Sequence, residues 1–173
     1  MKIRVKILLF CINCILFIAC DRVTKLIARH NLIHGQLTSY FHDTFRLKYV
    51  ENTSIAFKFA DNLPETTTFW LLGVLPLCIL AALFFFVIID IKKMTLLRSF
   101  SFSLIIAGAL GNIMDRIMYH RHVVVFMNIG INNLRTGIFN VADVCVIAGL
   151  AGLIIAYYKT NETVKTPETG ARA

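Results

Sequence analysis

Three aspartates, Asp21, Asp115 and Asp143, lie within or at the ends of long apolar segments. An ionisable side chain at the centre of a membrane helix costs at least about 2.5–3.5 kcal/mol, so such residues have a functional or structural reason. Two close carboxylates do not both ionise easily, so such a pair can activate water and protonate a leaving group. The three acids therefore predict acid–base chemistry, with ion pairing between helices as the structural alternative.

Each acid has polar residues close to it in the sequence: Lys25 four after Asp21, Asn112 and Arg116 around Asp115, and Asn140 three before Asp143. Residues three or four apart lie on the same face of a helix. Asp21 could therefore pair with Lys25, and an Asp115–Arg116 pair could brace a helix end. Asp143 has no neighbouring base in the sequence, which favours a catalytic role for it.

The composition of the chain identifies a membrane protein. Of its 173 residues, 57% are apolar and 16% are charged, and the mean hydropathy is +0.70. Soluble domains have about 45–50% apolar and about 25% charged residues. The formal charge of +8 fits basic residues that flank membrane spans and meet anionic lipid. We find no base-stacking or groove-reading element, so nucleic acid is not an expected partner.

The hydropathy pattern predicts four membrane spans, at about residues 7–27, 69–89, 100–114 and 138–158. The third run is short, so its outer end should include Asn112, Asp115 and Arg116. The basic residues at the N-terminus, in segment 91–99 and in the tail lie in short segments with few acids, which favours both termini inside. Under this topology the three acids reach a similar depth near the outer side.

Spacings of small residues in the third and fourth spans favour close helix packing. Ala107 and Gly111 are four apart, as are Ala148 and Gly152, and small residues at this spacing let membrane helices approach one another. The five cysteines all lie in apolar stretches and are interpreted as small buried hydrophobic residues, without a disulfide framework.

Two outer segments connect the spans, at about residues 28–67 and 117–137. Residues 45–50 (FRLKYV) alternate polar with apolar side chains, which predicts a strand in a small β element on the membrane. The segment 117–137 is rich in Asn and Gly and is expected to be irregular. Residues 159–173 are polar, contain Pro167 and Gly170, and are expected to be disordered.

Four motifs lie at the expected outer ends of the spans: residues 21–25 (DRVTK), 52–57 (NTSIAF), 108–116 (GALGNIMDR) and 139–143 (FNVAD). In this order the chain resembles the signal peptidase II family, over about residues 5–158. One such motif alone would be weak. Four together on a four-span chain are specific.

The resemblance implies an aspartic endopeptidase of the bacterial inner membrane, with the site at the outer leaflet and both termini cytoplasmic. Its substrates would be diacylglyceryl-modified prolipoproteins, cut before the lipidated cysteine. It implies Asp143 as a catalytic aspartate, and support from Asn112, Arg116 and Asn140, with Asn52 on the outer loop helping to hold the substrate. We add Asp21 and Lys25 to the supporting set. The family uses no metal or other cofactor, and nothing in the sequence requires more than a monomer.

Two positions depart from the family pattern. The second catalytic aspartate of the family lies in a Val-Val-Asp-Phe stretch, where this chain has Val125. Ser54 stands where the family favours glycine, so the backbone of the outer turn is expected to differ slightly. Positioned acid–base groups typically contribute about 10²–10⁴-fold to the rate, so the valine is the important difference.

Three interpretations remain open at this point. Asp115 could pair with Asp143 as the second catalytic carboxylate; the chain could be an inactive paralogue that binds lipidated peptides or lipid without cutting; or His120 or His122 could supply the second proton-transfer group. A small transporter is disfavoured because the chain lacks repeat halves and paired broken helices. We expect an all-α membrane protein, a four-transmembrane-helix bundle with a small periplasmic β element. Residues 1–158 would form the membrane domain and residues 159–173 a cytoplasmic tail.

Overall fold

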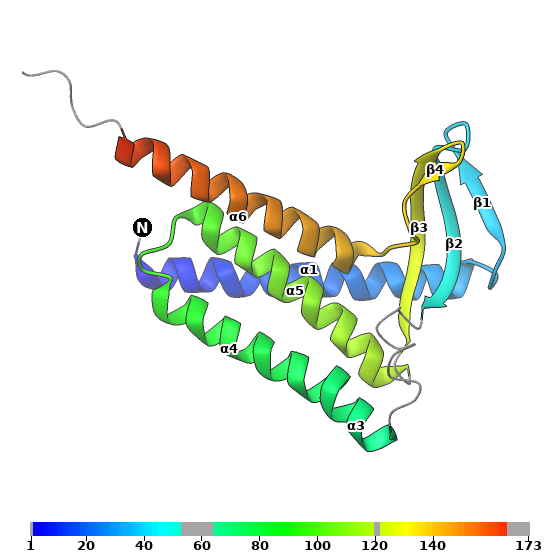
Figure 1. The fold of residues 1–173 in the computed structure, drawn as a ribbon, viewed down its shortest axis with the longest axis horizontal. Helices are drawn as coiled ribbons and strands as arrows, with labels where there is room; N and C mark the ends of the chain where they lie inside the picture. The colour runs from blue at the N-terminus through cyan, green and yellow to red at the C-terminus, as the bar shows by residue number, and fades with distance from the viewer. Residues whose placement is uncertain (1, 53–63, 120–121, 166–173) are drawn as a thin grey trace, which may run out of the picture.

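The computed structural model describes residues 2–52, 64–119 and 122–165. Long helices lie side by side, and a small sheet sits across one end of them, opposite the N-terminus (Figure 1). The elements, in chain order, are α1 (Ile3–Asn31), β1 (Leu37–Tyr40), β2 (Phe45–Asn52), α3 (Glu65–Phe69), η1 (Trp70–Val74), α4 (Leu75–Asp90), α5 (Leu96–Met118), β3 (Val123–Ile131), β4 (Leu134–Arg135) and α6 (Val141–Lys165).

The helices follow from the apolar segments of the sequence. Three of the helices in the described residues, α1, α5 and α6, are long and apolar enough to cross a membrane. The α4 helix is apolar but shorter, and it continues directly from α3 through the single π-helical turn η1. As predicted, α5 extends past Asn112, Asp115 and Arg116 before it ends at Met118.

The α5 helix packs against both α1 and α6 and is the most buried of the three spans. Small residues permit this close contact. A Cβ atom on Gly111 would lie 2.6 Å from Asp21 Oδ2, closer than a real Cβ atom can approach an oxygen. Gly152 of α6 likewise faces Ser101 of α5 without room for a larger side chain. The predicted small-residue packing is therefore confirmed at these two positions.

The sheet is antiparallel, with the strand order β1-β2-β3-β4. The predicted strand at residues 45–50 is confirmed as β2. The expectation of an irregular segment at 117–137 was wrong, because β3 runs for nine residues, from Val123 to Ile131. Its β-branched start favours a strand, and Asn132 and Asn133 form the two-residue connection to β4. Asn132 has a φ of +50°, which the mirror-image turns of tight hairpins require.

The turn between β1 and β2 has an unusual backbone. Phe41, His42 and Asp43 all have positive φ angles, of 52°, 51° and 68°. The Asp43 carboxylate accepts hydrogen bonds from Ser39 Oγ at 2.6 Å and from Arg46 Nε at 2.6 Å. These bonds hold a left-handed stretch that non-glycine residues rarely adopt.

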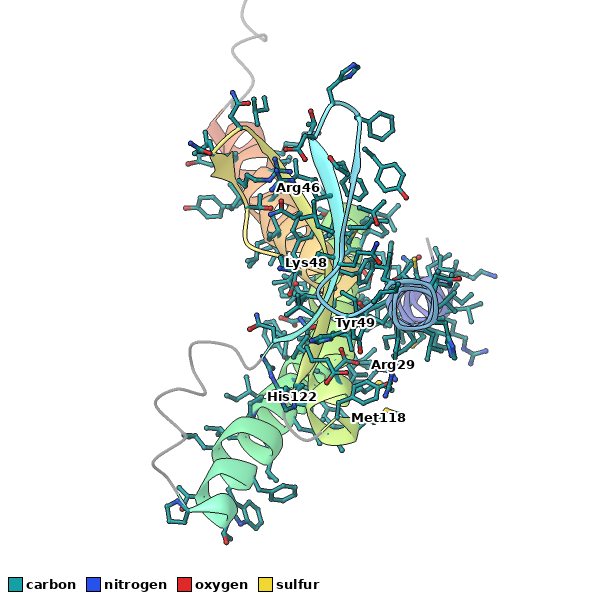
Figure 2. All side chains as sticks on the ribbon, turned by 90° about the vertical axis from the view of Figure 1, so that its right-hand side faces the viewer. Arg29, Arg46, Lys48, Tyr49, Met118 and His122 are labelled. Carbon is teal, nitrogen blue, oxygen red and sulfur yellow. The ribbon has the colours of Figure 1, made fainter. Side chains whose placement is uncertain are left out.

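The C-terminal end of α1 packs against the sheet. Ala28 shares a buried apolar cluster with Tyr49, Val124 and Phe126. Figure 2 looks onto this end of the molecule and shows Arg29 and Tyr49 close to the end of α1. The Arg29 guanidinium lies 4.9 Å from the ring centre of Tyr119, at the end of α5. These contacts tie the sheet to two of the long helices.

The α6 helix continues to Lys165, so the tail expected to be disordered from residue 159 is helical for its first part. Residues 160–165 (TNETVK) contain neither Gly nor Pro, and Pro167 is the first residue that opposes a helix. The remainder of the predicted tail and the position of Ser54 lie outside the described residues. The five cysteines are free.

Candidate active site

Asp143 lies in the first turn of α6 and is held there by Asn140. The Asp143 backbone N–H donates to Asn140 Oδ1 at 2.9 Å, and the Asn140 backbone N–H donates to Asp143 Oδ2 at 3.0 Å. This reciprocal arrangement is a capping box, in which two side chains satisfy free N–H groups at a helix start. It fixes the direction of the Asp143 carboxylate at the end of the bundle that carries the sheet.

The other oxygen of this carboxylate is held by α5. Asn112 Nδ2 donates to Asp143 Oδ1 at 2.9 Å. The Asn140 side chain donates to Asn112 Oδ1 at 3.0 Å and to the Val124 carbonyl at 2.9 Å. Asp143 therefore lies where α5, α6 and β3 meet. Asn112 and Asn140, which the sequence placed in a supporting set with this residue, both contact it.

Asp115 lies at the same end of the bundle as Asp143, but it has different partners. It forms an ion pair with Arg22 and lies 2.9 Å from Lys25 Nζ, and it accepts the Val124 backbone N–H at 3.1 Å. Its side chain has 0% exposure. Asp115 therefore joins α1, α5 and β3 through bonds that use both of its oxygens.

Asp21 and Lys25 form the predicted pair on α1, with Lys25 Nζ 2.7 Å from Asp21 Oδ2. Asp21 Oδ1 accepts the backbone N–H of Ala142, in the first turn of α6. A carboxylate at this place compensates the positive end of the helix dipole. Both side chains are buried, and charges buried this deeply require partners.

Accessibility separates the three acids. Asp143 is partly exposed, whereas Asp21 and Asp115 are fully buried. Part of the Asp143 surface is therefore open, whereas the other two acids are enclosed by their partners. Arg116 lies within electrostatic reach of both Asp143 and Asp115, so a positive charge is available beside the accessible carboxylate.

Val125 is the third residue of β3, with 4% exposure, opposite Val50. The residue before it, Val124, is bonded to both Asp115 and Asn140 through its backbone. Position 125 is therefore next to the site, and its side chain carries no group that exchanges a proton.

Asn52 pairs with Val123 at the end of β2, which places it at the site end of the sheet. His122 is partly buried, and its Nδ1 lies 2.9 Å from the Tyr119 carbonyl oxygen. His120 lies outside the described residues. Among the residues that the structure describes, no group of three His, Cys, Asp or Glu side chains could hold a metal ion.

Arg22 is a site residue that the sequence analysis did not single out. Its guanidinium pairs with Asp115 and lies 5.7 Å from the centre of the Tyr119 ring. An Asp115–Arg116 pair was the structural alternative for Asp115 in the sequence, and the ion pairs of Asp115 in the structure are with Arg22 and Lys25. The position of Arg22 directly after Asp21 in the first motif was the available signal. The backbone groups of Val124 and Ala142 could not be identified from side-chain types.

Comparisons with known proteins agree on one family. Residues 13–159 match the family model described as signal peptidase (SPase) II. A lipoprotein signal peptidase of Clostridium tetani (strain Massachusetts / E88) is 36% identical over 148 residues, covering 85% of this chain and 90% of the relative. One from Borrelia hermsii (strain HS1 / DAH) is 31% identical over 134 residues, covering 75% and 77%.

The fold is also similar to that of solved structures. A bacterial membrane enzyme determined by the in meso method at 2.3 Å resolution has a TM-score of 0.74 and 28% sequence identity, and the match covers 93% of this chain and 94% of that chain. A second, at 1.9 Å resolution, has a TM-score of 0.72 and 28% identity, covering 86% and 91%.

Proposed function

Because the chain belongs to the signal peptidase II family, we propose that Asp143 is the carboxylate that carries out its peptide hydrolysis. The chain is an aspartic endopeptidase that removes signal peptides from prolipoproteins. The observation that carries the assignment is the difference in exposure and in bonding partners among the three acids at the site. Asp143 is partly exposed and oriented by two asparagines, whereas Asp21 and Asp115 are buried in ion pairs.

The proposed mechanism uses Asp143 first as a base and then as an acid. Its carboxylate takes a proton from a water molecule, which attacks the scissile carbonyl carbon and forms a tetrahedral intermediate. The nearby Arg116 charge stabilises the developing oxyanion. The protonated Asp143 then gives its proton to the leaving nitrogen as the C–N bond breaks. Asn112 and Asn140 hold the carboxylate in one orientation throughout.

The remaining site residues have supporting roles in this proposal. Asn52, at the site end of β2, would help hold the substrate backbone, and Asp21 and Lys25 would brace α1 against the other helices. An Asp115/Asp143 catalytic pair stays a prediction. Asp115 is fully buried and both of its charged partners, Arg22 and Lys25, are cations, which supports a bracing role for that residue over proton transfer.

For the substrate, we propose prolipoproteins that carry diacylglycerol on the cysteine after the cleavage site. The site lies at one end of apolar helices with many outward-facing leucine, isoleucine and phenylalanine side chains, and this arrangement suits acyl chains and an apolar signal helix. The enzyme would act as a monomer in contact with membrane lipid, and without a cofactor or nucleic acid.

We further propose four membrane spans, with residues 1–158 as the membrane domain. The support for the fourth span is the unbroken helical segment formed by α3, η1 and α4. At 1.5 Å per residue, residues 65–90 reach about 39 Å, enough for a hydrocarbon core of about 30 Å. The chain is a bacterial membrane protein. We place it in the inner membrane with both termini in the cytoplasm and the site at the outer leaflet.

The test is cleavage of a diacylglyceryl-modified prolipoprotein by the purified chain in detergent. The parent should release the signal peptide, and Asp143→Asn should lower the rate by at least about 10²-fold, because the acid–base group is lost. Asp90→Asn is the matched control, since Asp90 lies at the other end of the bundle in a surface pair with Lys93. Loss of activity in both variants would contradict the assignment.

The alternative that Val125 raised, a protein that binds lipidated peptides without cutting them, is not favoured by the family to which the chain belongs. In the same experiment this candidate predicts binding of the prolipoprotein with no cleavage by the parent. Asp143→Asn would then change nothing, because there is no rate to lose.

A further inference from the structure

A single buried ammonium group connects the ion pairs on α1 to the accessible carboxylate. Lys25 Nζ lies 2.7 Å from Asp21 Oδ2, 2.9 Å from Asp115 Oδ2 and 3.2 Å from Asn112 Oδ1. The Lys25 side chain has 3% exposure, so no substrate atom can reach it. Asn112 in turn donates to Asp143. The lysine therefore reaches the catalytic carboxylate through one intervening side chain.

The chemistry of an ammonium group determines how the Asn112 amide is oriented. A lysine ammonium has hydrogen-bond donors and no acceptor, so the Asn112 oxygen must face Lys25. The amide nitrogen then faces Asp143, where it donates to Oδ1 at 2.9 Å. If the amide rotated by half a turn, its NH₂ group would meet the ammonium and its oxygen would meet the carboxylate.

Asn140 supports the same orientation with a neutral group, because its side-chain nitrogen also donates to Asn112 Oδ1. Lys25 differs from Asn140 because it carries a charge. The positive charge polarises the amide and strengthens its donation to the carboxylate, since hydrogen bonds to ionised groups are the stronger ones. Among the residues that the structure describes, further charges near Asp143 are Arg116 and Asp115 from α5 and Asp21 from α1.

We propose that Lys25 is a positioning residue for peptide hydrolysis, which orients Asp143 through the Asn112 amide. This inference rests on the proposed function of Asp143. It adds a role for Lys25 beyond joining helices. Since Lys25 does not touch the substrate, its removal should lower kcat and leave KM unchanged.

The difficulty in testing Lys25 alone is that its removal leaves buried negative charge. Asp115 would then keep only Arg22 as a cationic partner, and Asp21 would have none among the described residues, so Lys25→Met alone could fail to fold. The double variant Asp21→Asn/Lys25→Met avoids this problem, because one negative and one positive charge are removed together. Asn at position 21 also keeps an oxygen for the Ala142 N–H.

A matched control is available on the same helix. Lys6 donates to the Met94 carbonyl at 2.7 Å and so ties α1 to the turn before α5, at the end of the bundle far from Asp143. Lys6→Met removes a lysine that joins helices but leaves the Asn112 amide untouched.

The experiment measures kcat and KM for the prolipoprotein and the unfolding temperature in detergent, for the parent, Asp21→Asn/Lys25→Met and Lys6→Met. We expect the double variant to fold and to lose about 10²-fold in kcat at constant KM, because misplacement of a reacting group by a mutation away from the chemistry can cost about that much. Lys6→Met should keep the parent kcat. A folded double variant with the parent kcat would overturn the inference and leave the proposed function intact.

A second comparison tests the route through Asn112. In an Asn112→Ala background the same double substitution should cause no further loss in kcat, because residues that act as a unit are not additive. A full additional loss would show that Lys25 acts by another route and would overturn the inference. A parent that does not cleave at all would overturn the proposed function itself, together with this inference.

Discussion

Asn140 and Asp143 each accept the backbone N–H of the other, at 2.9 Å and 3.0 Å. The catalytic carboxylate is thus also part of the cap of α6. The bond that stabilises the helix start and the bond that orients the reacting group are made by the same pair of residues. Substitutions at Asn140 should therefore change stability and activity separately.

We expect Asn140→Ala to lower the free energy of unfolding by about 1 kcal/mol more than Asn140→Ser, because serine keeps an oxygen at the N-cap and alanine does not. Both variants lose the side-chain nitrogen that donates to Asn112 and Val124, so both should cleave more slowly than the parent. Unfolding in detergent and prolipoprotein cleavage measure the two effects. Equal stabilities of the two variants would show that the cap contributes little.

Val125→Asp should raise the rate of cleavage. Position 125 adjoins the site through Val124, and a carboxylate there would share acid–base work with Asp143, which is typically worth about 10²–10⁴-fold. The control is Val123→Asp, because Val123 is a buried residue of the same strand, two positions earlier. Cleavage by Val125→Asp no faster than by Val123→Asp would show that position 125 has no catalytic role in this chain.

Asp115→Asn should affect stability more than chemistry. The substitution leaves Lys25 and Arg22 without one of their buried partners, and breaking a buried pair costs about 3–5 kcal/mol. Asp143→Asn removes a partly exposed carboxylate and should unfold near the parent temperature, without activity. If Asp115→Asn instead kept the parent stability and abolished cleavage, Asp115 would be the second catalytic group. Thermal unfolding and cleavage assays on both variants make this distinction.

The helices and the site motifs could be predicted from the sequence, because apolar runs and polar interruptions are local signals. The Asp21–Lys25 pair follows from a spacing of four, and the sequence also indicated Asn112 and Asn140. The Arg22–Asp115 pair could not be derived in this way, because Arg22 and Asp115 are far apart in the sequence. The packing of α1 on α5 brings them together.

The long strand β3 was missed for a related reason. The Asn and Gly residues of segment 117–137 were interpreted as irregular, although Val123–Phe126 favours a strand. Pairing with β2 decides the outcome, and such pairing between segments distant in the sequence has no local signal. The Asn pair at 132–133 forms the turn after the strand rather than interrupting it.

Gly111→Ala should lower the free energy of unfolding by about 1–3 kcal/mol, the usual cost of overpacking a close contact. The added methyl group would lie 2.6 Å from Asp21 Oδ2, so α1 and α5 would have to separate at the level of the ion pairs. Gly73→Ala is the control, because no atom lies within 4 Å of a Cβ atom there. Unfolding temperatures in detergent compare the two. A stable Gly111→Ala variant would show that the two helices can move apart without cost.

Asp43 should make the sheet sensitive to acid. Hydrogen bonds from Arg46 and then from Ser39 hold the pKa of this carboxyl well below its usual range. A carboxyl whose pKa is lowered by folding stabilises the fold above its ordinary value, near 4, and the stabilisation is lost as the pH falls below it. Amide hydrogen exchange of β1 and β2 should therefore accelerate relative to Asp43→Asn as the pH is lowered. Parallel pH dependence in parent and variant would show that the turn at residues 41–43 is held by its backbone contacts, for which the Thr44 N–H donating to the Phe41 carbonyl is the candidate.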